Sequence, residues 1–187
     1  MCLGTGGVSY YDCAGDQHVK VLSGQVRLSP AVLANAAGRP DDILVVAGEV
    51  VVTGEVTSVG YGLTMIAGQL AAPAASRDVL EPVIQIQGQA AWFQGANPRV
   101  FNGDARVGPD FLRLLEQPTA LVVLGDLIIE EGVTETGLRE KITAITAFGD
   151  VVAPAGLVGM VQVLAAEVFG DIKAGARADD GSDGSGS

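Results

Sequence analysis

Residues 121–129 read Leu121-Val122-Val123-Leu124-Gly125-Asp126-Leu127-Ile128-Ile129, two apolar runs separated by a glycine and an acid. The same pattern occurs eight times along the 187-residue chain. The glycines lie 20 to 24 residues apart except for one interval of 15, which agrees with the repeat length of stacked parallel solenoids. They are Gly24, Gly48, Gly68, Gly88, Gly103, Gly125, Gly149 and Gly170.

The residue after each glycine is an acid or its amide. Counting this residue as position zero, apolar residues favour positions −5, −3, +1 and +3, the two-residue period of a strand with one buried face. Position zero then faces solvent, and a side chain in place of the glycine is expected to clash with a corner or a neighbouring coil. The residues at position zero are Gln25, Glu49, Gln69, Gln89, Asp104, Asp126, Asp150 and Asp171.

Proline marks three of the connectors. Pro30, Pro109 and Pro154 each follow a copy of the pattern, and proline is favoured in the first turn of a helix. We therefore expect several connectors to be one to three helical turns, while residues 49–107, which lack such signals, return through strands or turns. The predicted fold is a β-rich parallel solenoid of about eight rungs of 20–24 residues. Its connectors are short helices, and its form is either the β/α form of leucine-rich repeats or a β-helix.

The ends of the chain differ from its middle. Residues 1–18 are rich in glycine and polar groups and are predicted to be an N-terminal cap or an irregular segment. Residues 19–174 form the predicted solenoid domain. Residues 175–187 lose their apolar residues and are predicted to be a flexible acidic Gly/Ser tail.

The charge excludes several classes of partner. The chain has 22 acids and 11 bases, a net charge of −11, which repels nucleic acids and anionic membrane surfaces. No run of 18 uncharged apolar residues and no secretory leader is present, so we predict a soluble cytoplasmic protein without membrane insertion. In that compartment Cys2 and Cys13 are expected to be free thiols.

Two family resemblances support a stacked architecture. Ile142-x-x-Ile145-x-Ala147-x-x-Asp150-x-Val152 resembles the leucine-rich-repeat consensus, and Leu121-x-Val123-x-x-Asp126-x-Ile128 matches it in part. The valine- and glycine-rich residues 43–101 are similar in texture to bactofilins, bacterial β-helix proteins that form polymers. Both resemblances imply a parallel solenoid, and neither implies a catalytic residue in this chain.

Four aspartates at position zero raise the question of a cation site. Adjacent coils of a solenoid lie about 4.8 Å apart, where stacked carboxylates repel unless cations lie between them. The functional interpretation is a calcium edge or a pair of catalytic acids. The alternative, favoured because no histidine or aromatic platform accompanies the acids, is that each accepts a backbone N–H at a turn. The residues are Asp104, Asp126, Asp150 and Asp171.

The N-terminal segment offers a second set of possible ligands. Cys2, Cys13 and His18, with Asp12 or Asp16, could hold zinc, but the close cysteine pair of typical zinc sites is missing. His18 is the only histidine, so any Ser-His-Asp site would have to use it. We assign no catalytic residue, no cofactor and no metal, and we predict a protein that is not an enzyme.

The last prediction concerns contacts with other molecules. Trp92 and Phe101 occupy core positions, whereas Phe93 lies on the opposite face and is expected to be exposed. No amphipathic helix follows the last rung, which would leave an open strand edge. We therefore predict self-association into a filament or oligomer through rung ends or faces, with Phe93, Phe169 and Ile172 as interaction residues. The alternative is a binding module that presents its acidic face to a protein partner or calcium.

Overall fold

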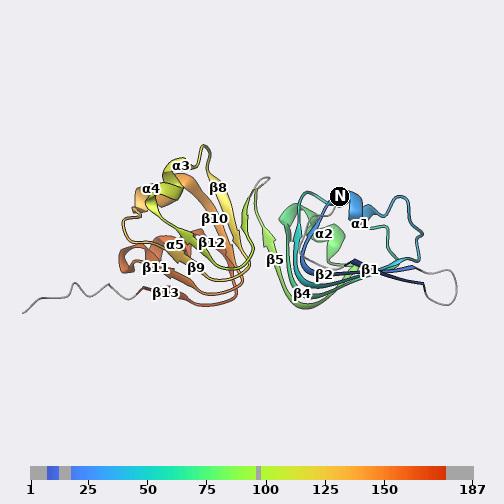
Figure 1. Ribbon diagram of the computed structural model, residues 1–187. Coiled ribbons are helices and arrows are strands. Elements are labelled where there is room, and N and C mark those ends of the chain that lie inside the picture. The colour runs from blue at the N-terminus through green and yellow to red at the C-terminus, as the bar shows by residue number, and fades with distance from the viewer. Residues whose placement is uncertain (1–7, 13–17, 96–97, 176–187) are drawn as a thin grey trace, which may run out of the picture.

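The computed structural model describes residues 8–12 (backbone only), 18–95 and 98–175, and it is a β-rich structure with three mainly parallel sheets and short helices (Figure 1). The strands are β1 (Val8–Asp12), β2 (His18–Leu28), β3 (Ile43–Val52), β4 (Leu63–Pro73), β5 (Ile84–Phe93), β6 (Arg99–Phe101), β7 (Ala105–Val107), β8 (Thr119–Val123), β9 (Leu127–Ile129), β10 (Ile142–Ala147), β11 (Val151–Ala153), β12 (Ala165–Val168) and β13 (Ile172–Ala174). The helices are α1 (Pro30–Ala34), α2 (Arg77–Leu80), α3 (Pro109–Leu114), α4 (Glu135–Lys141) and α5 (Val158–Leu164), with 3-10 turns η1 (Ala74–Ser76) and η2 (Ala155–Leu157).

Strands β1–β5 form one sheet, which we call the N-terminal stack. β2 to β5 are parallel and aligned on their glycines, so that Gly24, Gly48, Gly68 and Gly88 lie side by side. All four have positive φ, and a Cβ on any of the last three would collide with the carbonyl oxygen of the preceding glycine. Glycine is therefore required by close approach of adjacent strands, and the predicted clash with a neighbouring coil is confirmed.

Strands β6–β13 form the C-terminal stack. Here each copy of the pattern is divided at its Gly-Asp corner into two short strands. The first halves form the sheet β12-β10-β8-β6 and the second halves form the sheet β13-β11-β9-β7. Within one copy the predicted core positions Leu121, Val123, Leu127 and Ile129 are all buried in a single apolar cluster, which confirms the expected alternation.

Three helical connectors follow Pro30, Pro109 and Pro154 as predicted. α1 begins at Pro30 and is capped by the Ser29 hydroxyl, α3 begins at Pro109, and η2 with α5 follows Pro154. The prediction that residues 49–107 contain no helix is wrong, because η1 and α2 follow β4. Leu80 of α2 is fully buried against the sheet, and such packing stabilises a helical turn whose local signals are poor.

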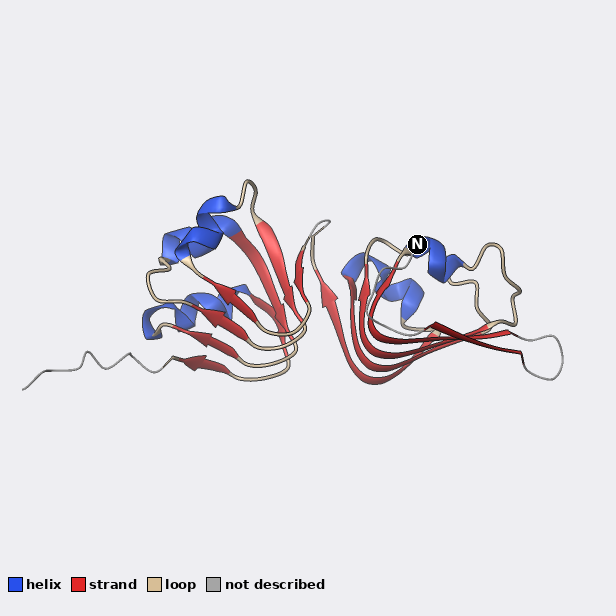
Figure 2. Cartoon of the chain, viewed as in Figure 1, coloured by secondary structure: helices blue, strands red, loops and turns tan. Residues whose placement is uncertain are grey.

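The eight copies form two stacks of four, and the prediction of one eight-rung stack is wrong. Among the described strands, β5 pairs with β4 alone and β6 with β8 alone. The break between the two stacks falls in the 15-residue interval between Gly88 and Gly103. This interval is too short for a strand and a connector that leads back to the next strand of the same sheet. In Figure 2 the two curved sets of strands stand side by side, each with helices on its open side.

A third apolar cluster joins the two stacks. In each stack its residues lie on the face of the strands opposite to the face that packs into that stack's own core. These are Val51, Ala71, Ala91 and Phe93 of the N-terminal stack and Val100, Val122, Leu124 and Phe148 of the C-terminal stack.

Part of the predicted cap or irregular segment is a strand. β1 pairs antiparallel with β2, joining residues 8–12 to residues 18–22, whereas β2 to β5 are all parallel. The rest of residues 1–17 and the predicted tail from residue 176 onwards lie outside the described residues.

Candidate functional site

The four aspartates of the C-terminal stack form a ladder of hydrogen bonds. The N–H of Asp126 donates to Oδ1 of Asp104 over 2.9 Å, and the N–H groups of Asp150 and Asp171 donate to Oδ1 of the aspartate one coil earlier over 2.8 Å. Backbone bonds run the other way, because the N–H of Ala105 donates to the carbonyl oxygen of Asp126. Each corner is therefore held to the next by a pair of bonds. Asp104, Asp126 and Asp150 each accept a backbone N–H, as the structural alternative predicted, but the donor belongs to the next coil.

The glycine before each of these aspartates makes room for the ladder. A Cβ on Gly125, Gly149 or Gly170 would collide with Oδ1 of the preceding aspartate and with the backbone beside it. The Gly-Asp pair is thus one device, in which the absence of a side chain on the first residue lets the carboxylate of the previous coil approach the backbone.

The last coil of the ladder carries its own counter-charge. Nζ of Lys173 lies 2.6 Å from Oδ2 of Asp150 and 3.5 Å from Oδ2 of Asp171. This ammonium, together with the N–H of Asp171, holds the pKa of the Asp150 carboxyl below its usual range. Asp150 in turn raises the pKa of Lys173. A lysine and backbone donors thus surround oxygens that a calcium ion would need.

Metal ligands do not gather anywhere in the described part of the chain, the ladder included. No group of three or more histidine, cysteine, aspartate or glutamate side chains is placed there to hold a metal. Of the zinc candidates, Cys2, Cys13 and Asp16 lie outside the described residues, and His18 is the first residue of β2.

The aromatic residues that the sequence placed at core positions pack on the apolar clusters. Trp92 packs on the core of the N-terminal stack, and Phe101 packs on the other core and against Phe111, with their ring centroids 6.0 Å apart. The prediction that Phe93 is exposed is wrong, because its exposed fraction is 3%. Its face of β5 is covered by the C-terminal stack, which a reading of one strand at a time does not anticipate.

One polar contact between the stacks was missed by sequence reasoning. A carboxylate oxygen of Glu167 in β12 accepts the backbone N–H of Trp92 in β5 over 2.9 Å. The bond satisfies one donor on the free edge of β5. Val122, Leu124 and Phe148 are apolar although they stand at even-numbered positions, which the repeat pattern assigns to the solvent face. These residues were the signal in the sequence that this face is buried.

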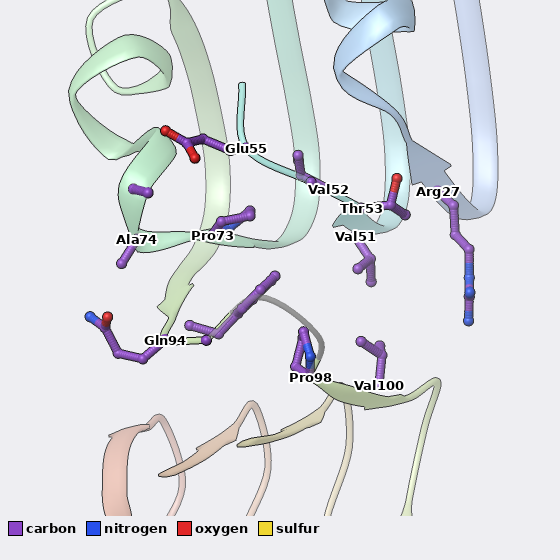
Figure 3. A pocket seen from close by; sticks show the side chains of 14 residues that line it. Arg27, Val51, Val52, Thr53, Glu55, Pro73, Ala74, Gln94, Pro98 and Val100 are labelled. Carbon is purple, nitrogen blue, oxygen red and sulfur yellow. The ribbon is translucent and has the colours of Figure 1, made fainter. Parts of the chain in front are cut away.

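A cavity of about 480 Å3 lies where the two stacks diverge (Figure 3). Val51, Pro73 and Phe93 of the N-terminal stack face Pro98 and Val100 across it. Among its described lining residues the charged ones are Arg27 and Glu55, and none is a histidine or cysteine. These residues are typical of a gap between two packed sheets and not of a catalytic site.

The end of the molecule formed by β5, β12 and β13 is open. Each of these strands pairs on one edge only with another described strand. Exposed apolar side chains gather on the same coils: Val83 precedes β5, Val163 lies on α5, and Phe169 lies between β12 and β13 with its ring stacked on Phe148. Of the predicted interaction residues, Phe169 is therefore exposed and Ile172 half-buried at this end, whereas Phe93 is interior.

Comparison with known proteins gives no relative for this chain: no protein-family model, curated protein or solved structure matches it. Among the described helices, none is long and apolar enough to cross a membrane.

Proposed function

We propose that the protein is a non-enzymatic structural protein that self-associates through the ends of its two stacks. The observation that carries this proposal is the open end formed by β5, β12 and β13. These strands belong to one end because β5 contacts both β10 and β12. Unpaired strand edges present rows of N–H and C=O groups, and another chain satisfies them most readily by adding a strand.

The apolar side chains of this end support the same proposal. Val163 is 80% exposed, Val83 is 45% exposed and Phe169 is 38% exposed. Leu114, which is 70% exposed, lies on α3 in the first coil of the C-terminal stack. Large exposed apolar residues thus lie on the first and the last helix of that stack, where a second copy would cover them.

We further infer that each stack is a short parallel solenoid. The C-terminal stack has the β/α form, because a helix follows each of its first three coils, as the leucine-rich-repeat-like residues 142–152 indicate. The N-terminal stack is closer to a β-helix, with strands of ten or eleven residues bent at a glycine. A short solenoid with an open end among its described strands is suited to end-to-end assembly.

Light scattering after size-exclusion chromatography, combined with negative-stain microscopy, tests the proposal. The mass is expected to rise with protein concentration. Val163→Glu places a charge on the open end and is expected to lower the mass. Thr136→Glu, a change at another exposed position, on α4 in a middle coil, is expected to leave it unchanged. A wild-type protein that stays monomeric across the concentration series would contradict the proposal.

A further inference from the structure

The aspartate ladder has a direction and two unfinished ends. Each carboxylate accepts an N–H from the following coil, and each corner N–H finds its acceptor in the preceding coil. Within the described residues, Oδ1 of Asp171 accepts no hydrogen bond and the N–H of Asp104 donates none. One end of the stack therefore offers an acceptor, and the other offers the donor that matches it.

On the other side of each corner, a second series of backbone bonds has the same direction as the ladder. The N–H of Leu124 donates to the carbonyl oxygen of Phe101, and Phe148 and Phe169 repeat this bond one and two coils later. Continued by one more coil, the series would join the N–H at position 102 of a second chain to the carbonyl oxygen of Val168. The two ends are thus complementary in more than one bond.

We propose that the C-terminal stacks of two copies join head to tail, with Oδ1 of Asp171 in one copy accepting the N–H of Asp104 in the next. This inference rests on the self-association proposed above and specifies its geometry. The register of the existing coils places Ile172 beside Ala105 of the next copy and Val168 beside Phe101 of the next copy. The ladder then runs through the joint as it runs through the stack.

The space at the first corner favours this joint. Nothing lies within 4 Å of the position that a Cβ on Gly103 would take, whereas at Gly125 and its later counterparts that space holds the preceding carboxylate. Gly103 itself has a φ of +84°, so glycine is also favoured there by its backbone.

The N-terminal stack does not repeat this arrangement. β1 covers the edge of β2 from His18 to Leu22 in antiparallel pairing. A parallel strand from another copy cannot occupy that part of the edge. The joint is therefore made by the C-terminal stacks, and β1 acts as an edge cap on the other stack.

Disulfide trapping distinguishes this joint from other contacts. In the proposed register Lys173 lies beside Arg106 of the next copy, about 4.8 Å away between Cα atoms, which suits a disulfide. The full chain with Cys2→Ser and Cys13→Ser is the background, and Lys173→Cys and Arg106→Cys are made separately. After mild oxidation, the mixture of the two variants is expected to give a covalent heterodimer, and each variant alone is expected to give none.

The outcomes separate this inference from the proposed function. Homodimers of Lys173→Cys alone would show a two-fold contact between like ends, which overturns the head-to-tail joint and leaves self-association standing. Oligomers that give no cross-link would overturn the register. Monomers in light scattering would overturn both proposals.

A matched pair of substitutions tests the ladder bond itself. Asp171→Ala removes the acceptor and is expected to raise the concentration at half-assembly roughly tenfold, the effect of one charge-assisted hydrogen bond. Asp171→Asn keeps Oδ1 as an acceptor and is expected to change it roughly twofold at most, although both variants lose the contact with Lys173. Equal effects of the two substitutions would contradict a bond from Asp104 of the next copy.

Discussion

The two stacks use the same repeat position in different ways. At position zero the N-terminal stack has glutamine or glutamate and the C-terminal stack has aspartate. In the first, each strand continues through the corner, as in β3 from Ile43 to Val52. In the second, the strand stops at the corner, as between β8 and β9. One repeat pattern thus gives two kinds of corner.

Side-chain length explains the difference. An aspartate carboxylate is short enough to accept the backbone N–H of the next corner, as Asp104 does from Asp126. Glutamine and glutamate are one methylene longer and bond to the next side chain instead. Nε2 of Gln25 donates to a Glu49 oxygen over 3.1 Å, and Gln69 and Gln89 form a longer bond of 3.5 Å. The comparison teaches that one methylene decides whether a corner is held through backbone or through side chains.

The largest expected effect comes from the glycines of the N-terminal stack. Gly68→Ala would place a Cβ against the carbonyl oxygen of Gly48 at a φ of +137°, so it is expected to reduce the free energy of unfolding by about 4 kcal/mol. Gly156→Ala is the control, because nothing lies within 4 Å of its Cβ position. Urea unfolding measures both. Equal stability of the two variants would contradict the close approach of β3 and β4.

A smaller effect is expected at the aspartate corners. Asp126→Ala removes the acceptor for the N–H of Asp150 and is expected to cost about 1–2 kcal/mol, whereas Asp126→Asn keeps an acceptor oxygen. Gln69→Ala, which removes only a weak side-chain contact, is expected to cost less than about 0.5 kcal/mol. A cost for Gln69→Ala as large as that for Asp126→Ala would show that the two kinds of corner are equivalent.

The smallest effect is the contribution of the last corner to the dependence of stability on pH. Because the pKa of Asp150 in the folded protein is below its ordinary value of 3.8, the charged carboxylate stabilises the native state above that pH. This contribution is lost as the pH falls below 3.8 and through the folded pKa. Lys173→Met is expected to raise the pKa of Asp150, measured by carbon-13 NMR titration, and to flatten the pH dependence of unfolding in that window. If the pKa of Asp150 were unchanged in this variant, Lys173 would not be the main cause of its lowered value.

Much of each stack follows from local sequence. The alternation around Gly125 and Asp126 predicted which of the flanking residues are buried, and Pro30 and Pro109 predicted two helix starts. The aspartates at position zero predicted either a cation edge or carboxylates that accept a backbone N–H, and the carboxylates of Asp104, Asp126 and Asp150 each accept a backbone N–H from the next coil. These features depend on contacts between neighbouring repeats, which the repeat pattern itself encodes.

The sequence by itself determined the repeat, its buried face and the need for glycine at each corner, because these depend on strand alternation and on the close spacing of adjacent coils. Only the tertiary structure decided that the chain divides after β5 and that the faces carrying Phe93 and Leu124 are buried against each other. The physical reason is that the alternation of residues along a strand predicts burial of only one face. The other face is covered by residues far away in the chain, and contacts such as the hydrogen bond from the Trp92 N–H to Glu167 cannot be predicted from one repeat.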